Sequence, residues 1–261
     1  MQTARLLLKE SSLFFLLSAA NLLLAKPLSD QNNHEKPIFD FLTFRSDQTE
    51  KTLLEIFCQI PIQTLQFVKA PGGFAARYQI RLEIQNTVFA QTNRQTSYVD
   101  SVYTHSLDDI AWMNPVVIRF PLLVPPGEYQ LVFYVRDLET LSDFGFTKNL
   151  RVPDYFGPEL KLSDIQIAAH IAPAGDDPEK VRNTMKIIPC VSKTLRSESD
   201  TLFVYCEIYN LQYRSQERSK HFSAELTIKD QAGAAIKTLE IHCSSGGPLL
   251  WATQRQWRRL P

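Results

Sequence analysis

The sequence predicts an all-β protein with two tandem immunoglobulin-like β-sandwich domains after an N-terminal signal peptide. Three observations support this fold class. Short apolar segments alternate with polar residues at a period of two, turn residues separate these segments, and helical periodicity is nearly absent after the N-terminus. An apolar content of 44% is enough to fill the cores of two such domains.

Residues 125–137 give the strongest strand signal in the chain. Pro125, Pro126 and Gly127 predict a turn. The alternation that follows places four apolar residues on one face and polar residues on the other: Tyr129, Leu131, Phe133 and Val135 against Glu128, Gln130 and Arg136. This period of two is typical of a half-buried central strand of a sandwich, because on a helix it would spread apolar groups around the whole cylinder.

The N-terminus predicts a secretory signal peptide over residues 1–25. Arg5 and Lys9 precede an apolar run at residues 13–17, and small residues follow at Ser18, Ala20 and Ala25. A retained membrane anchor is the alternative, but residues 13–25 fall short of the ~20 apolar residues that span a bilayer. We therefore expect an exported protein, periplasmic or extracellular, with no membrane span after cleavage.

The first domain is expected over residues 49–153, after a flexible polar spacer at residues 26–48. Apolar residues return within this spacer at residues 39–44, a segment too brief to assign. The expected strands of the domain lie at residues 53–60, 63–68, 77–85, 98–103, 116–120, 128–137 and 148–152.

The second domain is expected over residues 154–245, after the proline- and glycine-rich boundary at residues 152–158. Its expected strands lie at residues 160–168, 185–191, 201–210, 221–229 and 235–242. The pattern of residues 125–137 does not recur, so the sequence leaves open whether this sandwich is complete or truncated. An incomplete sandwich has an open sheet edge, which predicts a strand-edge dimer. An irregular tail is expected at residues 246–261.

Charge and cysteine content restrict the partners and the redox state. The 28 basic residues balance the 28 acidic ones, so no overall field favours nucleic acid. Four cysteines, Cys58, Cys190, Cys206 and Cys243, permit three pairings. A bridge between Cys190 and Cys206 and buried free thiols are both compatible with their apolar surroundings.

Three groups of residues are candidates for chemistry, and none of them predicts a catalytic or metal site. His105 and Ser106, followed by Asp108 and Asp109, lack the spacing of a nucleophile and its base, so we expect a capped turn. Zinc ligands are usually paired two to four residues apart. The remaining candidates lack that spacing or the ligand ladder of a calcium loop: Cys190, Cys206, His242 and Cys243, and Asp176, Asp177 and Glu179. We expect no cofactor.

The candidate binding surface is an aromatic strand face formed by Phe203, Tyr205, Glu207 and Tyr209. Its opposite face, which includes Val204 and Cys206, is aliphatic and is expected in the core. Exposed tyrosines beside a carboxylate suit a sugar platform or a protein interface. The alternative is that a neighbouring sheet or domain covers this face.

Several phrases of the sequence resemble the N-terminal part of bacterial GWxTD-domain proteins, over roughly residues 50–240. These phrases lie at residues 65–67, 126–129, 150–155, 162–165 and 205–211. The chain departs from the family in lacking the Gly-Trp-x-Thr-Asp motif, since Trp251 precedes Ala252, Thr253 and Gln254. The resemblance implies a secreted protein and transfers no catalytic residues.

These observations together predict a function in binding. We expect a secreted, non-catalytic binding or structural module of the bacterial cell envelope, with a protein or polysaccharide partner. The absence of any Asn-x-Ser/Thr sequon is in keeping with a bacterial origin. The alternative is an accessory, carbohydrate-binding part of an envelope hydrolase.

Overall fold

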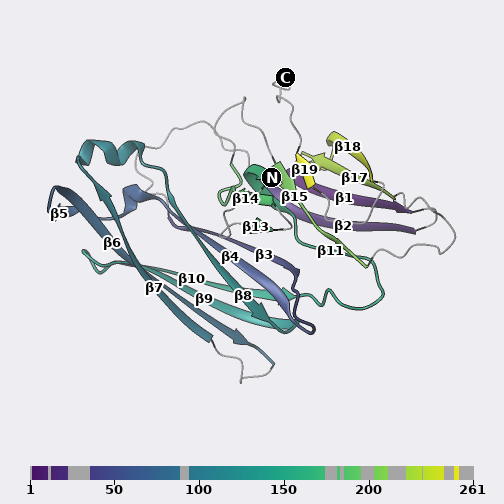
Figure 1. The fold of residues 1–261 in the computed structure, drawn as a ribbon, viewed down its shortest axis with the longest axis horizontal. Helices are drawn as coiled ribbons and strands as arrows, with labels where there is room; N and C mark the ends of the chain where they lie inside the picture. The colour runs from purple at the N-terminus through teal and green to yellow at the C-terminus, as the bar shows by residue number, and fades with distance from the viewer. Residues whose placement is uncertain are drawn as a thin grey trace. The chain divides into compact units, whose positions relative to one another are not determined.

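The computed structural model describes residues 2–10, 13–22, 36–88, 94–173, 181–182, 185–194, 203–210, 222–230, 232–243 and 250–252. In this part the protein is all-β: its strands pair in antiparallel sheets, and its helical segments are two short 3₁₀ helices (Figure 1). The chain divides into two compact units, Leu28–Asp154 and a unit formed by Met1–Pro27 with Tyr155–Pro261.

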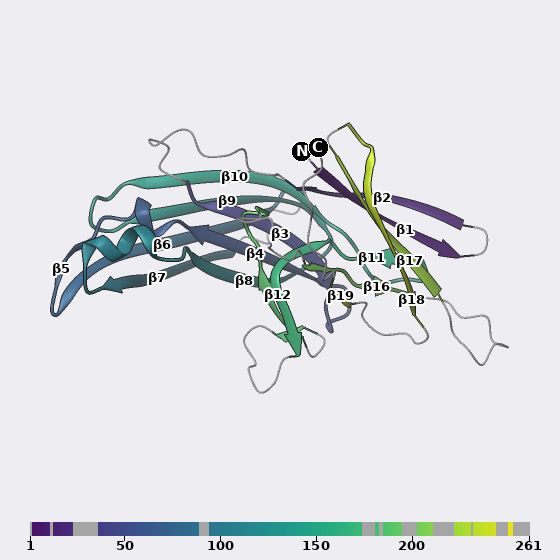
Figure 2. The same cartoon turned by 90° about the horizontal axis from the view of Figure 1, so that it is seen from above.

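The described residues of the unit Leu28–Asp154 form two antiparallel sheets. One has the order β3-β4-β8, and the other runs β10-β9-β6-β7, with β5 pairing the beginning of β6 (Figure 2). The strands are β3 (Ile38–Arg45), β4 (Thr52–Ile60), β5 (Val68–Ala70), β6 (Gly73–Asn86), β7 (Arg94–Thr104), β8 (Val116–Val124), β9 (Gly127–Asp137) and β10 (Asp143–Val152). The 3₁₀ helix η1 (Ile62–Thr64) follows β4, and η2 (Leu107–Trp112) follows β7.

The inner faces of these two sheets share one hydrophobic core. The alternating positions of β6 and β9 are buried, as the period of two in the sequence predicts. Phe133 of β9 is fully buried, and its ring contacts Phe39 of β3 at a centroid distance of 4.8 Å and Phe120 of β8 at 6.3 Å. Aromatic contacts between the sheets therefore make the unit a β-sandwich.

Two predictions for this unit are wrong. The spacer expected at residues 26–48 contains strand β3, which pairs with β4 along its whole length. Phe39 and Phe41 of β3 pack against the core, so this brief apolar segment belongs to the sandwich. The strand expected at residues 63–68 is instead part of η1 and an irregular segment at residues 65–67, and β5 begins only at Val68, although Leu65 and Phe67 are buried.

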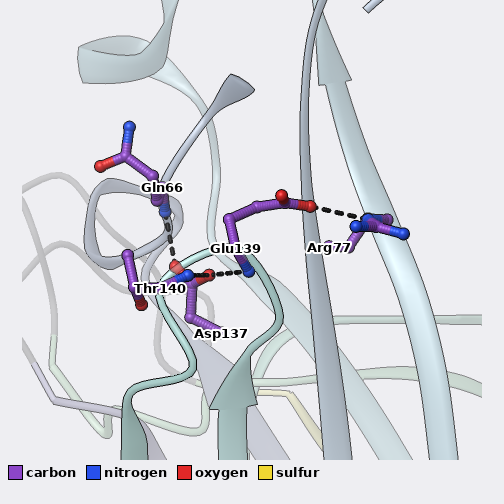
Figure 3. A network of polar contacts seen from close by, with 5 residues as sticks. All are labelled: Gln66, Arg77, Asp137, Glu139 and Thr140. Carbon is purple, nitrogen blue, oxygen red and sulfur yellow. Dashed lines mark hydrogen bonds and ion pairs between the residues drawn. The ribbon is translucent and has the colours of Figure 1, made fainter. Parts of the chain in front are cut away.

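A buried carboxylate fixes the turn between β9 and β10 and holds the segment after η1 (Figure 3). Asp137 Oδ2 accepts a hydrogen bond from the backbone of Gln66 at 2.6 Å. Its Oδ1 accepts from the backbone N–H groups of Glu139, at 2.7 Å, and Thr140, at 3.0 Å. Glu139 in turn forms an ion pair with Arg77 of β6. These bonds satisfy the backbone donors that lack a ladder partner.

In the residues that the structure describes, the other unit contains three sheets. Their orders are β18-β17-β1-β2, β13-β14-β12-β15-β19 and β11-β16. The strands are β1 (Gln2–Glu10), β2 (Leu13–Leu22), β11 (Lys161–Leu162), β12 (Gln166–Pro173), β13 (Val181–Arg182), β14 (Met185–Pro189), β15 (Phe203–Tyr205), β16 (Ile208–Tyr209), β17 (Phe222–Lys229), β18 (Ala235–Cys243) and β19 (Leu250–Ala252).

The ends of the chain differ from the sequence expectations in two places. The segment predicted as a signal peptide forms strands β1 and β2. Because β1 pairs along β17 in the full chain, that edge of β17 is covered. Cleavage of the segment remains a prediction. The tail expected to be irregular at residues 246–261 contains β19, which pairs with β15. Residues 253–261 of that tail lie outside the described residues.

Within the described part of the chain, no helix has the length and apolar character needed to cross a membrane.

Candidate binding surface

The aromatic face predicted at Phe203, Tyr205, Glu207 and Tyr209 is not a free surface. Tyr205 is 0% exposed and Tyr209 is 4% exposed, while Phe203 is half-buried. Both tyrosine hydroxyls donate to the buried carboxylate of Glu207, and the Tyr209 bond measures 2.6 Å. The prediction of an exposed platform is therefore wrong, because both tyrosines are buried.

A break in the strand explains this burial. β15 ends at Tyr205 and β16 begins at Ile208, so the alternation does not continue through the segment. The backbone N–H of Glu207 donates to Ser163 Oγ at 2.8 Å, and the ring of Tyr209 lies against Tyr155 at a centroid distance of 5.0 Å. The cluster is a fully bonded polar core, the arrangement that a buried carboxylate requires.

The residues considered for catalysis form a capped turn, as the sequence predicts. Ser106 is the N-cap of η2, and its Oγ accepts from the backbone N–H of Asp108 at 3.3 Å. The ring of His105 packs edge-on against Tyr103, and its Nδ1 lies 3.3 Å from the carbonyl oxygen of Gly72. His105 and Ser106 therefore have separate local partners.

The three cysteines whose side chains are described are free thiols. Cys58 and Cys206 are buried, and Cys190 is half-buried. The bridge considered between Cys190 and Cys206 is thus not formed, while the side chain of Cys243 lies outside the described residues. No group of metal-ligating side chains occurs among the residues that the structure describes. The acidic loop at residues 176–179 lies outside them.

A polar surface depression lies on the outer face of β6, β9 and β10. We call it the Tyr134 groove, a shallow depression of about 180 Å³. Its lining combines one aromatic ring with amide and charged groups of both signs: Gln79, Arg81, Glu83, Tyr134, Arg136 and Asp143. The strand registers bring these residues together from positions far apart in the sequence.

The lining residues form rows that run across the strands. In the first row, Gln79 lies opposite Arg136, which lies opposite Asp143. In the second row, Tyr134 lies between Arg81 and Gly145. Residues that lie directly opposite on neighbouring strands point to the same face, so both rows project from the outer side of the sheet.

An ion pair fixes the charged end of the groove. The guanidinium of Arg136 donates from Nε and Nη2 to the two carboxylate oxygens of Asp143, both at 2.6 Å. These hydrogen bonds hold the pKa of Asp143 below its ordinary value, and the nearby charge of Arg81 lowers that pKa further. The same bonds raise the pKa of Arg136. Both groups are charged at neutral pH, in a bidentate geometry that orients the guanidinium.

Tyr134 supplies the aromatic surface of the groove. Its side chain is 40% exposed, whereas the inward-facing aromatic residues of β9 are buried. A Cβ atom at Gly145 would lie 3.4 Å from Cε1 and 3.5 Å from Cδ1 of the ring. The ring therefore lies over the glycine, close to the sheet, where a larger side chain would compete for the space.

The sequence contains a signal for this surface that the strand pattern alone did not single out. Tyr134 is the one aromatic residue at an outward position of the run 128–137, beside Arg136. Its partners Arg81 and Asp143 come from other strands, so only the pairing registers assemble the groove.

Comparison with known proteins gives no relative: no protein-family model and no curated protein matches the chain.

Proposed function

We propose that the protein is an exported, non-catalytic binding module of the bacterial cell envelope, and that the Tyr134 groove is its binding surface. The observation that carries this proposal is the partly exposed Tyr134 between Arg81 and Gly145, in the row next to the Arg136–Asp143 ion pair. Tyrosine and arginine are enriched at protein interfaces and contribute much of their binding energy. A protein partner with complementary charges suits this surface best.

The immunoglobulin-like character of the sandwich is part of the proposal. Strands β3, β4 and β8 correspond to strands A, B and E of one sheet, and β6, β7, β9 and β10 to C, C′, F and G of the other. Tyr129, near the start of β9, donates its hydroxyl to the carbonyl oxygen of Pro125 at 2.8 Å. This bond has the form of the tyrosine corner that such domains carry at the beginning of strand F.

Export and the envelope location rest on two features of the sequence. One is the predicted signal peptide at residues 1–25, which directs the chain to the periplasm or the exterior. The other is the resemblance of residues 50–240 to the N-terminal part of GWxTD-domain proteins. Their namesake motif is absent from this chain, so the resemblance supports a location and no activity.

A second candidate function is an accessory, carbohydrate-binding role beside an envelope hydrolase. The observation in its favour is the position of the Tyr134 ring over Gly145, beside the amide of Gln79 and the carboxylate of Asp143. A ring that lies on a sheet with polar groups around it can stack a sugar and bind its hydroxyls.

Retention on the immobilised full chain tests both candidates. The probes are soluble periplasmic protein and purified peptidoglycan. We expect Tyr134→Ala to lose the bound component, because the ring is the centre of the groove. The matched control is Trp112→Ala, which removes another exposed ring, 88% exposed and outside the groove. A protein lost only in Tyr134→Ala supports the first function, and peptidoglycan lost only in that variant supports the second. Equal retention by both variants contradicts the site, and no retention by the native chain contradicts a binding function.

A further inference from the structure

The outer edge of β7 is long and exposed. The strand pairs with β6 along Arg94–Thr104, and no strand pairs with its other edge among the residues that the structure describes. Arg94 to Ser101 are all exposed, and Val102 is half-buried. Tyr98, Val99 and Tyr103 give this strand the aromatic and β-branched composition that favours pairing. Such an edge presents unpaired backbone donors and acceptors to another strand.

Other edges of this sandwich carry features that hinder pairing with a second copy of the same edge. β8 contains Pro121, which has no N–H to donate. β3 carries the buried Asp40, and β10 carries Lys148 at a position opposite the buried Leu131. When two copies of such an edge pair so that the inward-pointing charge of one lies near the same charge of the other, the two charges repel.

β7 differs because it has two charges of opposite sign on one face. Arg94 lies opposite Ile84 and Asp100 lies opposite Tyr78, and both of these β6 residues point to the core. The hydroxyl of Tyr98 donates to Asp100 at 2.7 Å and keeps the pKa of that carboxyl below its ordinary value. Asp100 is therefore ionised at neutral pH.

We propose that the edge of β7 pairs with the same edge of a second copy of this chain, in an antiparallel register centred on Ser97. In this register Arg94 of each copy lies opposite Asp100 of the other, so two ion pairs form by symmetry. Registers centred on Arg94 or on Asp100 bring like charges together and are disfavoured. The opposite charges thus select a second copy in one register.

The pairing has a simple geometric consequence. The two-fold axis stands perpendicular to the sheet, because residues opposite each other on paired strands share a face. The two sheets become continuous, and their outer faces lie on the same side. The dimer does not depend on the Tyr134 groove, and it needs no ligand.

Sedimentation velocity of the full chain, from about 1 µM to about 1 mM, tests the proposal over the range of weak complexes. We expect a concentration-dependent dimer. Arg94→Asp replaces both attractions by repulsions and should weaken the dimer on the order of tenfold or more. Arg94→Lys keeps the charge and should retain it. The control is Arg151→Asp, at an exposed residue of β10. It makes the same change of charge away from the β7 edge and should not affect dimerisation.

Mixing two variants gives the sharpest test. Asp100→Arg should also fail to dimerise, but an equimolar mixture with Arg94→Asp should form a heterodimer, because both cross-strand pairs are again of opposite sign. Circular dichroism checks that Asp100→Arg is folded, since Asp100 accepts hydrogen bonds from Tyr78 and Tyr98. If Asp100→Arg is not folded, the difference in dimerisation between Arg94→Asp and Arg94→Lys tests the proposal instead. A monomer at every concentration, or undiminished dimerisation of Arg94→Asp, overturns the proposal.

These outcomes are independent of the proposed function. Dimerisation is measured without periplasmic protein or peptidoglycan, and the substitutions leave the Tyr134 groove intact.

Discussion

At the residue scale, two tyrosines of strand β9 have opposite roles. Tyr129 is 1% exposed and donates its hydroxyl to Pro125, whereas Tyr134 is 40% exposed and lies in the groove. Their positions differ by an odd number of residues, so they point to opposite faces of the sheet. One therefore supports the fold, and the other is available to a partner.

Replacing Tyr129 by Phe tests its structural role. The variant keeps the ring in the core but removes the hydrogen bond to the Pro125 carbonyl, so the free energy of unfolding should fall by about 1 kcal/mol. Urea denaturation followed by circular dichroism measures this change. Tyr134→Phe is the matched control and should change stability by less than about 0.5 kcal/mol, because its side chain is partly in solvent. Equal stability of the two variants would count against a tyrosine corner.

Buried thiols predict a dependence on pH. Burial raises the pKa of Cys58 from 9.0 to about 12, and burial also raises that of Cys206 to about 12. These thiols stay protonated in the folded chain after they ionise in the unfolded one. Their contribution to stability is complete below pH 9 and is lost as the pH rises toward 12.

The burial of these thiols, on which the pH dependence rests, is tested by thiol labelling at pH 8, with and without denaturant, followed by mass spectrometry of each cysteine. Cys58 and Cys206 should react only when the chain is unfolded, because thiolate is the reactive form and both side chains are buried. Labelling of Cys58 in the native protein at the rate seen in denaturant would contradict the burial described above.

At this scale, a local interruption of a strand explains why the aromatic face was wrongly predicted to be exposed. Residues 202–209 alternate as one strand would, which places Tyr205 and Tyr209 outside the core. The strand is interrupted between β15 and β16, and the buried carboxylate of Glu207 accepts hydrogen bonds from both tyrosine hydroxyls. The hydrogen bonds between this buried carboxylate and its neighbours form only in the folded chain, so the periodicity of the sequence cannot predict them.

At the scale of elements, the central strands could be predicted because burial follows the period of two. β6 and β9 show this alternation, whereas β4 lies where a strand was expected although most of its residues are buried. Residues 63–68 share the pattern without forming a strand, since Gln66 donates its N–H to Asp137 instead of to a neighbouring strand. Alternation thus reports which side chains are buried, and the destination of the backbone hydrogen bonds decides whether a strand forms.

Strand β3 provides the prediction at this scale. A chain that begins at Lys36 should fold, whereas one that begins at Thr49 should be much less stable, because it loses the pairing with β4 and the packing of Phe39 on Phe133 and Phe146. Truncating one such aromatic side chain typically costs about 3–5 kcal/mol. Thermal unfolding of both chains measures the difference. Equal melting temperatures would show that β3 adds nothing to the sandwich.

At the scale of the whole molecule, the sequence predicted two domains and a binding surface, but most of the residues of that surface are buried. The chain divides between Asp154 and Tyr155, within the proline- and glycine-rich segment 152–158. The groove depends on the registers of three strands that are distant in sequence, as the row from Gln79 through Arg136 to Asp143 shows. Spacing along the chain cannot give such registers, because the loops between the strands differ in length.

The Tyr134 groove is proposed to recognise a partner. Its charged end offers a direct test, because Arg136 and Asp143 can be exchanged for each other. The double variant Arg136→Asp with Asp143→Arg keeps an ion pair at the same place and should leave stability nearly unchanged, since exposed ion pairs contribute little. It reverses the order of charges that a partner meets.

The decisive measurement is the dissociation constant of this double variant for the envelope component that the native chain retains, compared with that of the native chain. We predict affinity at least about tenfold weaker, because reversed charges face groups complementary to the original order. Affinity equal to that of the native chain, with the fold intact, would show that the ion pair only joins two strands and that the partner binds elsewhere.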